Sequence, residues 1–457
     1  MRNDLATEEK RQYNTIRERM AARRREGRVK DGGATMSCTY IRCSAEKQMG
    51  REGRGTLIQS ELPACGDALL SRYGGSMQMV YLDPPFNTGK RFDMKMRVGA
   101  KGYRTGSPTL ALLAYEDRWR DRAQYLGLMR EALVVARGLL KKEGTIFLHA
   151  DGRMAAHLRL LMDEVFGEHH FLNEIVWSYQ SGGRARSYFP RKHDVILFYA
   201  KSRSYYFNLR AVPVSRCETR SNHMRRAVDS DGRSYRAITS GGKEYRYYDD
   251  EPAYPGDVWD DISHLQQKDP QRTGYDTQKP LKLLQRIVSC STQQEDWVCD
   301  LFSGSGTTAV AAAQLGRRFV CVDQSPLAIS VSSKRLSQTT AGKPLDFAYD
   351  VEAPCGPDDC RVEAEVFPAI SSYTVRLIDF ECEAAREEGI AGMDAVDQWS
   401  AGFVQGDVYR RCVSSVRSQA TPELAATLEM PVCAGEPCVM IVDIWGNRRF
   451  YLPRRRY

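Results

Sequence analysis

The chain of 457 residues contains no apolar run long enough to cross a membrane, since runs such as residues 132–136 end after a few positions. Its first residues, MRNDLATEEK, are charged from the second position and contain no apolar core of the signal-peptide type. We therefore expect a cytoplasmic protein with no membrane partner. The 13 cysteines are an odd number, spread from Cys38 to Cys438, so we expect reduced and mostly buried thiols rather than a disulfide framework. A hydrophobic share of 42% excludes wholesale disorder, and the length predicts two to four structural units.

The net charge of +8 is concentrated in two segments. Residues 178–251 hold 15 Arg and Lys against 8 Asp and Glu, and residues 1–30 hold 10 against 5. In the first of these segments the arginines alternate with nine tyrosines. Guanidinium groups bind phosphates and base edges, and phenol rings stack on bases, so the segment predicts nucleic-acid contact. For residues 1–30 a solvated surface is an equally good interpretation.

Strand-like and helix-like segments alternate from about residue 57 to residue 200. Short apolar runs at 78–82, 145–150, 174–179 and 195–200 predict buried strands, and apolar residues at helical spacing in 121–140 and 154–166 predict helices. The alternation stops near residue 178 and resumes at Lys279, with strands at 297–301 and 318–322 and helices at 306–315 and 326–336. Such alternation is typical of an α/β fold with a doubly wound, mostly parallel, Rossmann-like sheet.

A glycine-rich loop, DLFSGSGTT, runs from Asp300 to Thr308 between a predicted strand and a predicted helix. Glycines at such a position let a ligand approach the main chain closely. Asp323 ends the next predicted strand, where an acidic side chain can bind both hydroxyls of a ribose. The loop lacks the GxGxxG spacing and carries no basic residue for a pyrophosphate, which favours a nucleoside cofactor without phosphates, S-adenosylmethionine above all. A tight strand–helix junction without a ligand is the alternative.

A second loop, DPPFNTG, follows the strand predicted at 78–82. Its prolines fix the backbone and remove two N–H donors, which makes a stiff loop that presents carbonyl oxygens. The Asp83 carboxylate and the Pro84 carbonyl are suited to accept the two hydrogens of an exocyclic amine, and Phe86 is suited to stack on a planar base. A rigid loop without chemistry is the structural alternative.

DPPFNTG, DTQKP and DLFSGSGTT, in this order, resemble the amino-group DNA methyltransferases of the β arrangement. Residues 55–340 are most similar to the adenine-N6 enzymes related to the modification subunits of type III restriction–modification systems. The resemblance implies methyl transfer to N6 of a flipped-out adenine, with double-stranded DNA as the partner, and it leaves open a homodimer and a restriction subunit. One departure is Phe86, where the family more often has Tyr; stacking survives this change, but a phenol hydrogen bond does not.

The resemblance also implies roles for individual residues. The catalytic loop comprises Asp83, Pro84, Pro85 and Phe86. The residues implied or inferred to hold S-adenosylmethionine are Gln278, Lys279, Pro280, Asp300, Phe302, Gly304, Gly306, Thr307 and Asp323. For DNA contact we single out Arg184, Arg186, Arg225 and Arg226. The chemistry needs no metal.

Changes in composition and in the strand–helix alternation divide the chain into five parts, and the resemblance gives the middle three their expected roles. These are a basic N-terminal arm (1–50), the catalytic half of the methyltransferase domain (51–177), a target-recognition region (178–270), the cofactor-binding half (271–340) and a separate, small β-rich domain (341–457).

Other activities and other sites compete with this interpretation. Cytosine-N4 methylation, RNA methylation and a catalytically silent DNA-binding subunit are the alternative functions. Two Cys-x4-Cys pairs, Cys355–Cys360 and Cys433–Cys438, have a looser spacing than most zinc sites, so we favour free thiols there. We expect His149 to be structural or to line the cleft, and Trp259 to pack the recognition region against the catalytic domain.

Overall fold

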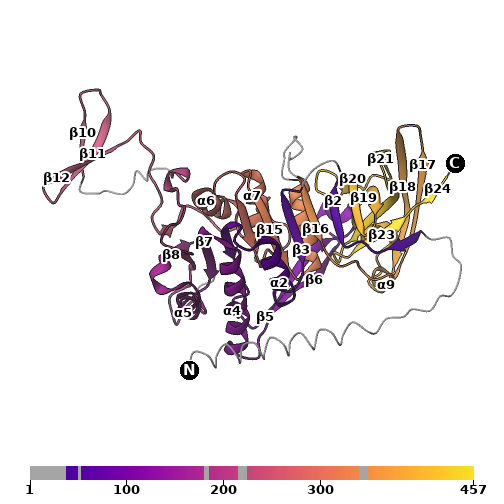
Figure 1. The fold of residues 1–457 in the computed structure, drawn as a ribbon, viewed down its shortest axis with the longest axis horizontal. Coiled ribbons are helices and arrows are strands. Elements are labelled where there is room, and N and C mark those ends of the chain that lie inside the picture. The colour runs from indigo at the N-terminus through magenta and orange to yellow at the C-terminus, as the bar shows by residue number, and fades with distance from the viewer. Residues whose placement is uncertain (1–37, 50–52, 180–184, 215–223, 339–347, 457) are drawn as a thin grey trace. The chain divides into compact units, whose positions relative to one another are not determined.

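The computed structural model describes residues 38–49, 53–179, 185–214, 224–338 and 348–456 (Figure 1). Residues 1–37 of the basic N-terminal arm and the candidate DNA contact Arg184 lie outside these ranges. Among the described residues, no helix combines the length and the hydrophobicity that crossing a membrane requires.

Six parallel strands form the centre of a 15-stranded sheet, in the order β16-β3-β15-β14-β4-β7. Their bounds are β3 (Gly55–Gln59), β4 (Met77–Leu82), β7 (Leu140–Ala150), β14 (Trp297–Asp300), β15 (Arg318–Asp323) and β16 (Tyr349–Glu352). On one side the sheet continues through β9 (His193–Ala200), β8 (Phe171–Ser178) and β13 (Val258–Trp259), with β9 antiparallel to both β7 and β8. The expected α/β sheet is therefore confirmed, with one reversed strand near its end.

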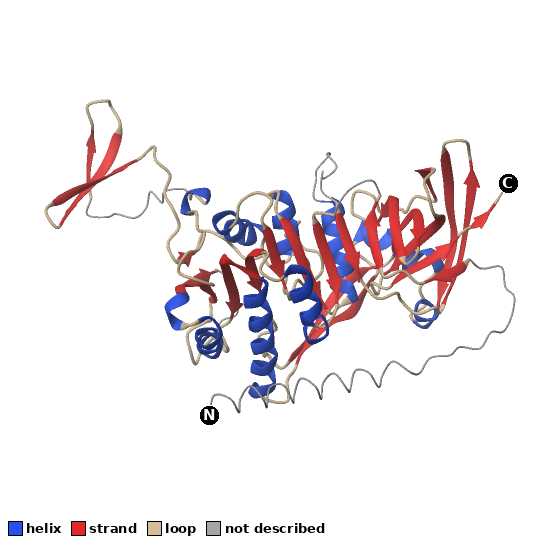
Figure 2. Cartoon of the chain, viewed as in Figure 1, coloured by secondary structure: helices blue, strands red, loops and turns tan. Residues whose placement is uncertain are grey.

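Helices cover both faces of this sheet (Figure 2). One face packs against α2 (Leu62–Tyr73), α4 (Arg122–Leu139) and α5 (Ala155–Phe166). The other face packs against α6 (Leu281–Ser291), α7 (Thr307–Gln314) and part of α8 (Pro326–Gln338). Each helix buries an apolar side; in α4 this side consists of Tyr125, Met129, Leu133 and Ala136. The sheet strands are apolar on both faces because both faces are buried.

A hairpin leads back to the sheet edge after the DPPF loop. It consists of β5 (Lys90–Arg97), α3 (Gly99–Thr105) and β6 (Thr109–Asp117), and β5 pairs antiparallel with β6. Its apolar residues, Met94 and Met96 among them, pack against Tyr275 and against α8. The hairpin thereby brings Tyr115 and Asp117 to the carboxyl ends of the parallel strands.

The C-terminal region is β-rich, as expected, but it is not separate from the sheet. Strand β16 pairs with β2 (Ala45–Gln48), β2 pairs with β20 (Val408–Val416), and the sheet goes on through β19 (Val396–Gln405), β22 (Glu436–Asp443), β23 (Arg448–Leu452) and β1 (Thr39–Ile41). The separateness that we expected is corrected here, because β16 belongs to residues 341–457 and pairs directly with β3 of the central sheet. Residues 45–48 then join β16 to β20, so the sheet is continuous.

A second, four-stranded sheet packs on this extension. It contains β17 (Cys360–Pro368), β18 (Ser372–Cys382), β21 (Thr427–Pro431) and β24 (Arg454–Arg455), and the short helix α9 (Glu383–Glu387) follows β18. Buried residues of both sheets, Val375 and Phe380 on one side and Trp399 and Val439 on the other, form one core.

The segment expected to recognise the target contains two different structures. Strand β9 lies within residues 178–270 yet belongs to the central sheet. Strands β10 (Arg225–Val228), β11 (Ser234–Ser240) and β12 (Lys243–Tyr248) form an antiparallel sheet of their own. Trp259 is buried in the core beneath α6, and Arg286 lies 5.0 Å from its ring, which confirms its packing role.

Candidate active site

The two loops singled out in the sequence lie at the ends of neighbouring strands. Strands β4 and β14 pair in parallel, with Tyr81 opposite Asp300, so Asp83 and the glycine-rich loop emerge side by side. Strand β15 pairs with β14 on its other side and ends at Asp323. Open α/β sheets bind their ligands at this edge. Residues more than 200 positions apart are thus brought to one place by strand pairing alone.

A cavity of about 500 Å³ connects these loops. Asp83 and Pro85 line it from the catalytic loop, and residues from Asp300 to Ser305 line it from the glycine-rich loop. Tyr115 and Tyr275, whose rings stack at 6.3 Å, and Asp323 line it as well. Its size is that of a small-molecule site.

The catalytic loop is held in place by Asp117, a residue that our sequence analysis did not single out. The Asp117 carboxylate is fully buried and accepts hydrogen bonds from the backbone N–H groups of Asn87 (2.9 Å) and Thr88 (2.8 Å). Trp119 donates its indole N–H to the same carboxylate at 3.0 Å. Asn87 itself has a left-handed backbone, with φ of 54°. These bonds fix the turn that follows Phe86.

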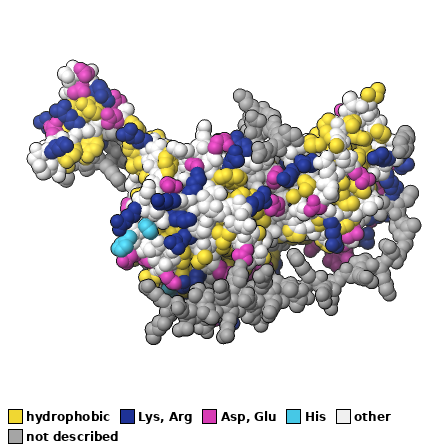
Figure 3. Space-filling model, in the orientation of Figure 1, with side chains coloured by type: hydrophobic (Ala, Val, Ile, Leu, Met, Phe, Trp, Pro, Cys, Tyr) yellow, Lys and Arg dark blue, Asp and Glu magenta, His cyan; other side chains and the backbone are white. Residues whose placement is uncertain are grey.

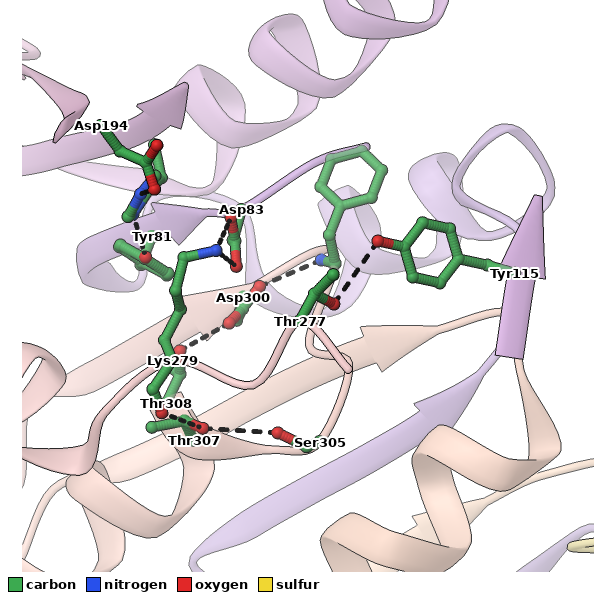
Figure 4. A network of polar contacts seen from close by, with 12 residues as sticks. Tyr81, Asp83, Tyr115, Asp194, Thr277, Lys279, Asp300, Ser305, Thr307 and Thr308 are labelled. Carbon is green, nitrogen blue, oxygen red and sulfur yellow. Dashed lines mark hydrogen bonds and ion pairs between the residues drawn. The ribbon is translucent and has the colours of Figure 1, made fainter. Parts of the chain in front are cut away.

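Asp83 is paired with Lys279, as the close view in Figure 4 shows. The Lys279 Nζ donates to both carboxylate oxygens, at 2.8 and 2.7 Å. The same ammonium lies 5.1 Å from the centre of the Phe86 ring. The resemblance assigns Lys279 to the cofactor, whereas the structure places its charged end on the carboxylate expected to bind the target amine.

His149 lies beneath the catalytic loop rather than in the cavity. It is fully buried, and its ring stacks on Phe86 at 5.9 Å with 22° between the planes. Its Nδ1 lies 2.9 Å from the Tyr81 hydroxyl, and its Nε2 lies 3.1 Å from Asp194. Burial works against ionisation of Asp194, but His149, the positive charge of Lys279 and the hydrogen bond from Tyr179 together outweigh it and hold the pKa of Asp194 below its usual value. Of the two roles left open for His149, the structure favours the structural one.

The glycine-rich loop needs its glycines for two reasons. Gly304 and Gly306 both have left-handed backbones, with φ of 49° and 75°. At Gly306, a Cβ atom would lie 2.4 Å from the Ser332 hydroxyl, so the loop and α8 approach too closely for any side chain. Gly306 is also the residue that opens α7.

Two carboxylates hold this loop in place, the buried Asp300 and the half-buried Asp323. Asp300 accepts from the Phe302 N–H at 3.0 Å and from the Thr308 hydroxyl at 2.5 Å, and burial raises its pKa to about 7 against the effect of these bonds. Asp323 accepts from the N–H groups of Ser325 (2.9 Å) and Gly304 (2.8 Å), and burial raises its pKa to about 6. Asp300 is only 2% exposed, so its bonds tie the loop to the sheet.

Two residues of α8 also support the loop, and our sequence analysis missed both. The Arg335 guanidinium donates to the Ser305 carbonyl at 2.7 Å and to the Thr307 hydroxyl at 2.9 Å. Ser332 donates to the Gly304 carbonyl at 3.2 Å. Nothing in the helical spacing of α8 distinguishes these two positions from its other polar residues.

The TQKP segment is anchored mainly to its own surroundings. The Gln278 amide accepts from the Thr273 hydroxyl at 2.8 Å and donates to the Gln271 carbonyl at 2.7 Å. Pro280 precedes the first turn of α6, and the Lys279 carbonyl accepts from the Thr307 hydroxyl at 3.3 Å. The segment therefore connects the start of α7 to the catalytic loop.

The described arginines of residues 178–270 differ in whether an acidic side chain pairs with them. Arg186, Arg225 and Arg226 are exposed and, within the described part of the chain, make no ion pair. Other arginines of the same region are neutralised locally, in the pairs Arg233–Asp250, Arg236–Asp249 and Arg246–Glu244. Figure 3 shows the resulting mixture of cationic and acidic side chains over this three-stranded sheet. Only part of the positive charge of the segment is therefore free for a partner.

The cysteines of the two Cys-x4-Cys pairs have other neighbours. Cys360 lies opposite Cys382 across strands β17 and β18, Cys355 bonds with the backbone of Cys43, and Cys433 lies beside Cys412. In the described ranges, no group of three or more His, Cys, Asp or Glu side chains is arranged to hold a metal ion.

Comparison with known families agrees with this geometry. Residues 77–334, more than half of the chain, match the family model described as DNA methylase. The chain belongs to this family.

Three curated relatives have low identity to the chain and cover it in part. The type II methyltransferase M.EcaI of Enterobacter cloacae is 26% identical over 58% of this chain and 65% of its own length. The DNA adenine methyltransferase YhdJ of Escherichia coli is 26% identical over 57% of this chain and 76% of its own length. The Mod subunit of the type III restriction-modification enzyme StyLTI of Salmonella typhimurium is 25% identical over 54% of this chain and 48% of its own length. The chain thus spans between about half and three quarters of these proteins.

Among solved structures, the M1.HpyAVI–SAM complex matches 62% of this chain and 98% of its own, with 14% identity and a TM-score of 0.39.

Proposed function

We propose that this protein is a DNA methyltransferase that transfers a methyl group from S-adenosylmethionine to the N6 amine of adenine. The observation that carries the proposal is the cavity that runs from Asp83 to the glycine-rich loop and Asp323. Membership of the DNA methylase family supports the reaction class. The name of the relative YhdJ supports adenine.

The residues around the cavity fit the cofactor. Gly304 lines the cavity and leaves its backbone open to close approach, and the Asp323 carboxylate retains lone pairs for the two ribose hydroxyls. Tyr115 and Tyr275 offer aromatic surface, and no basic side chain stands in the loop to require a phosphate. S-adenosylmethionine supplies a methyl group on a positively charged sulfur.

The catalytic loop activates the target amine. The lone pair of an exocyclic amine is delocalised into its ring, which makes the nitrogen a poor nucleophile. If Asp83 and the Pro84 carbonyl each accept one N–H, the lone pair is held toward the methyl donor, and Asp83 is placed to receive the proton that the methylated nitrogen releases. Catalysis of this kind consists of positioning and electrostatic assistance.

Two further features concern the substrate. A base inside a duplex cannot reach a cavity at a sheet edge, so the adenine must be flipped out, and Phe86 then replaces part of its lost stacking. Double-stranded DNA is held by the region around Arg186, Arg225 and Arg226, whose charges are exposed. The similarity to a type III Mod subunit supports a place in a restriction–modification system, with a restriction subunit or a second copy of the chain as predicted partners.

Nucleoside analysis tests the proposal. The protein is incubated with S-adenosylmethionine and unmethylated duplex DNA or RNA, and the digested product is analysed by mass spectrometry. We expect N6-methyladenine in DNA. N4-methylcytosine supports the alternative base, product in RNA alone refutes DNA as the substrate, and cofactor binding without any product indicates a silent DNA-binding subunit.

The variant Asp83→Ala ties the reaction to the site. It should abolish methyl transfer while cofactor affinity stays within about tenfold, because Asp83 contacts the amine and not the cofactor. The control is Asp93→Ala, which removes a carboxylate on β5 that pairs with Arg91 and does not line the cavity. Near-normal turnover in Asp83→Ala would exclude this residue from the mechanism.

A further inference from the structure

The ion pair between Lys279 and Asp83 occupies the position that the proposed reaction needs. The two N–O distances, 2.8 and 2.7 Å, are nearly equal, so Nζ lies in front of the carboxylate and bonds to both oxygens. Both side chains are largely buried, at 11% and 17% exposure. A charge-assisted bond of this kind is strong, and it satisfies the carboxylate in the absence of a substrate.

The backbone of Lys279 is fixed, while its side chain has space on two sides. Thr307 and the bonds of the Gln278 amide hold the segment in place. Thr277, Gln278 and Lys279 line the cavity described above and also a second cavity of about 750 Å³. Lys279 therefore borders both cavities.

A second carboxylate, that of Asp194, lies in the lining of the second cavity. Asp194 lines it, together with Trp177, Tyr179 and His264. One Asp194 oxygen accepts from the Tyr179 hydroxyl at 3.1 Å, and the other lies 3.1 Å from His149. A carboxylate has about four lone-pair sites, so Asp194 retains capacity for an ammonium group.

We propose that Lys279 is a placeholder for the target amine: its ammonium binds Asp83 until the base enters, and it then moves toward the side of Asp194. The inference rests on the function proposed above. An ammonium and an exocyclic amine are both N–H donors, and two nitrogen atoms cannot occupy the same position in front of one carboxylate. Target binding is therefore an exchange of one donor for another, and Lys279 is a positioning residue rather than a ligand of the cofactor.

The test compares Lys279→Met, which removes the charge but keeps an unbranched side chain, with Lys279→Arg, which keeps a donor. Binding is measured for duplexes that carry either adenine or unsubstituted purine, which lacks the 6-amine, at the target position. In the wild type the amine must displace the ammonium, so the preference for adenine is small. In Lys279→Met we expect this preference to increase about tenfold, with a lower KM for DNA, because Asp83 is then free to accept. Lys279→Arg should stay close to the wild type.

Two controls separate this role from others. Lys282→Met removes an exposed lysine of the adjacent helix, whose Nζ contacts the Asp261 carbonyl at 3.3 Å, and it should change nothing. In an Asp83→Asn background, Lys279→Met should no longer change the preference for adenine, since the pair is already broken. This second comparison removes any general effect of the methionine on folding.

The outcomes are distinct. A loss of cofactor affinity of more than about tenfold in Lys279→Met, with an unchanged preference for adenine, would make Lys279 a cofactor ligand and overturn the placeholder. An unchanged preference with normal cofactor affinity would overturn it as well. If the wild-type protein methylates no DNA, the proposed function is refuted, and the role proposed for Lys279 is refuted as well.

Discussion

Replacing Gly306 by alanine tests whether the glycine-rich loop is shaped by its approach to α8. Gly306 has φ of 75°, and an added Cβ would lie 2.4 Å from the Ser332 Oγ, 2.6 Å from its Cβ and 3.0 Å from its Cα. Gly316, at the other end of α7, has nearly the same backbone, with φ of 71°, but nothing lies within 4 Å of its added Cβ. The two glycines are therefore matched in backbone conformation and differ in whether an added Cβ would meet a neighbouring helix.

The expected magnitudes follow from this difference. The left-handed backbone costs alanine about 1–2 kcal/mol at either position. Crowding against α8 adds about 1–3 kcal/mol at Gly306 alone, the usual range for an overpacked site. Urea unfolding of the apo-protein should therefore show Gly306→Ala as the less stable variant by about 1–3 kcal/mol. Calorimetry should show weaker S-adenosylmethionine binding for Gly306→Ala and unchanged binding for Gly316→Ala.

A compensating change sharpens the test. Ser332→Gly removes the two closest atoms, so that the nearest remaining atom of residue 332 is its Cα, at 3.0 Å from the added methyl group. Measured against Ser332→Gly alone, Gly306→Ala should then destabilise the protein much less than it does in the wild type. If Gly306→Ala and Gly316→Ala lose equal stability, or if Ser332→Gly brings no relief, the close approach of the loop to α8 is not what requires glycine.

Three further predictions concern charge. Asp323→Asn should weaken S-adenosylmethionine binding by about tenfold to a hundredfold, because a charge-assisted acceptor is lost; an unchanged calorimetric affinity would place the ribose elsewhere. Burial raises the pKa of Asp300 from about 4 to about 7, so the folded state holds a proton that the unfolded state has lost between these two values. The wild type should therefore lose stability as the pH rises from about 4 to about 7, and Asp300→Asn should gain stability relative to it over that range, by at most a few kcal/mol in urea unfolding, with a constant difference above it. A difference that does not change between about pH 4 and 7 would contradict the buried carboxylate. Arg226→Ala should weaken binding to all duplexes and reduce the slope of log affinity against log salt concentration by about one. Arg233 is already paired with Asp250, so Arg233→Ala should leave this slope unchanged. Equal effects of the two variants on the slope would refute the distinction.

Local patterns in the sequence were sufficient for most of the central α/β elements. The run expected at 78–82 is β4 (Met77–Leu82), and the helix expected at 154–166 is α5 (Ala155–Phe166). Such elements are specified by apolar spacing and by the glycines that end them, and both are properties of neighbouring residues. The two loops were found for the same reason, since a proline pair or a glycine pair constrains the backbone wherever it occurs.

Contacts between residues distant in the sequence could be identified only from the tertiary structure. Asp117 was not singled out, because an aspartate at a strand end has no pattern that distinguishes a buried acceptor of two backbone N–H groups from a solvated carboxylate. The C-terminal strands were expected to be separate, because nothing in the sequence of residues 341–457 shows that residues 349–352 pair with β3 or that residues 45–48 link them to β20. Strand pairing depends on which edge is left open by the rest of the fold, and this is not a local property.

The sequence alone thus determined the α/β elements, the two loops and the kind of chemistry that each loop suits. Only the tertiary structure decided that β4 and β14 are neighbours, which places Asp83 beside the glycine-rich loop. It also decided that the Lys279 ammonium binds Asp83, an assignment that the TQKP motif does not contain. The physical reason is the same in both cases: hydrogen bonds and ion pairs form between groups that the fold brings within about 3 Å, whatever their separation along the chain.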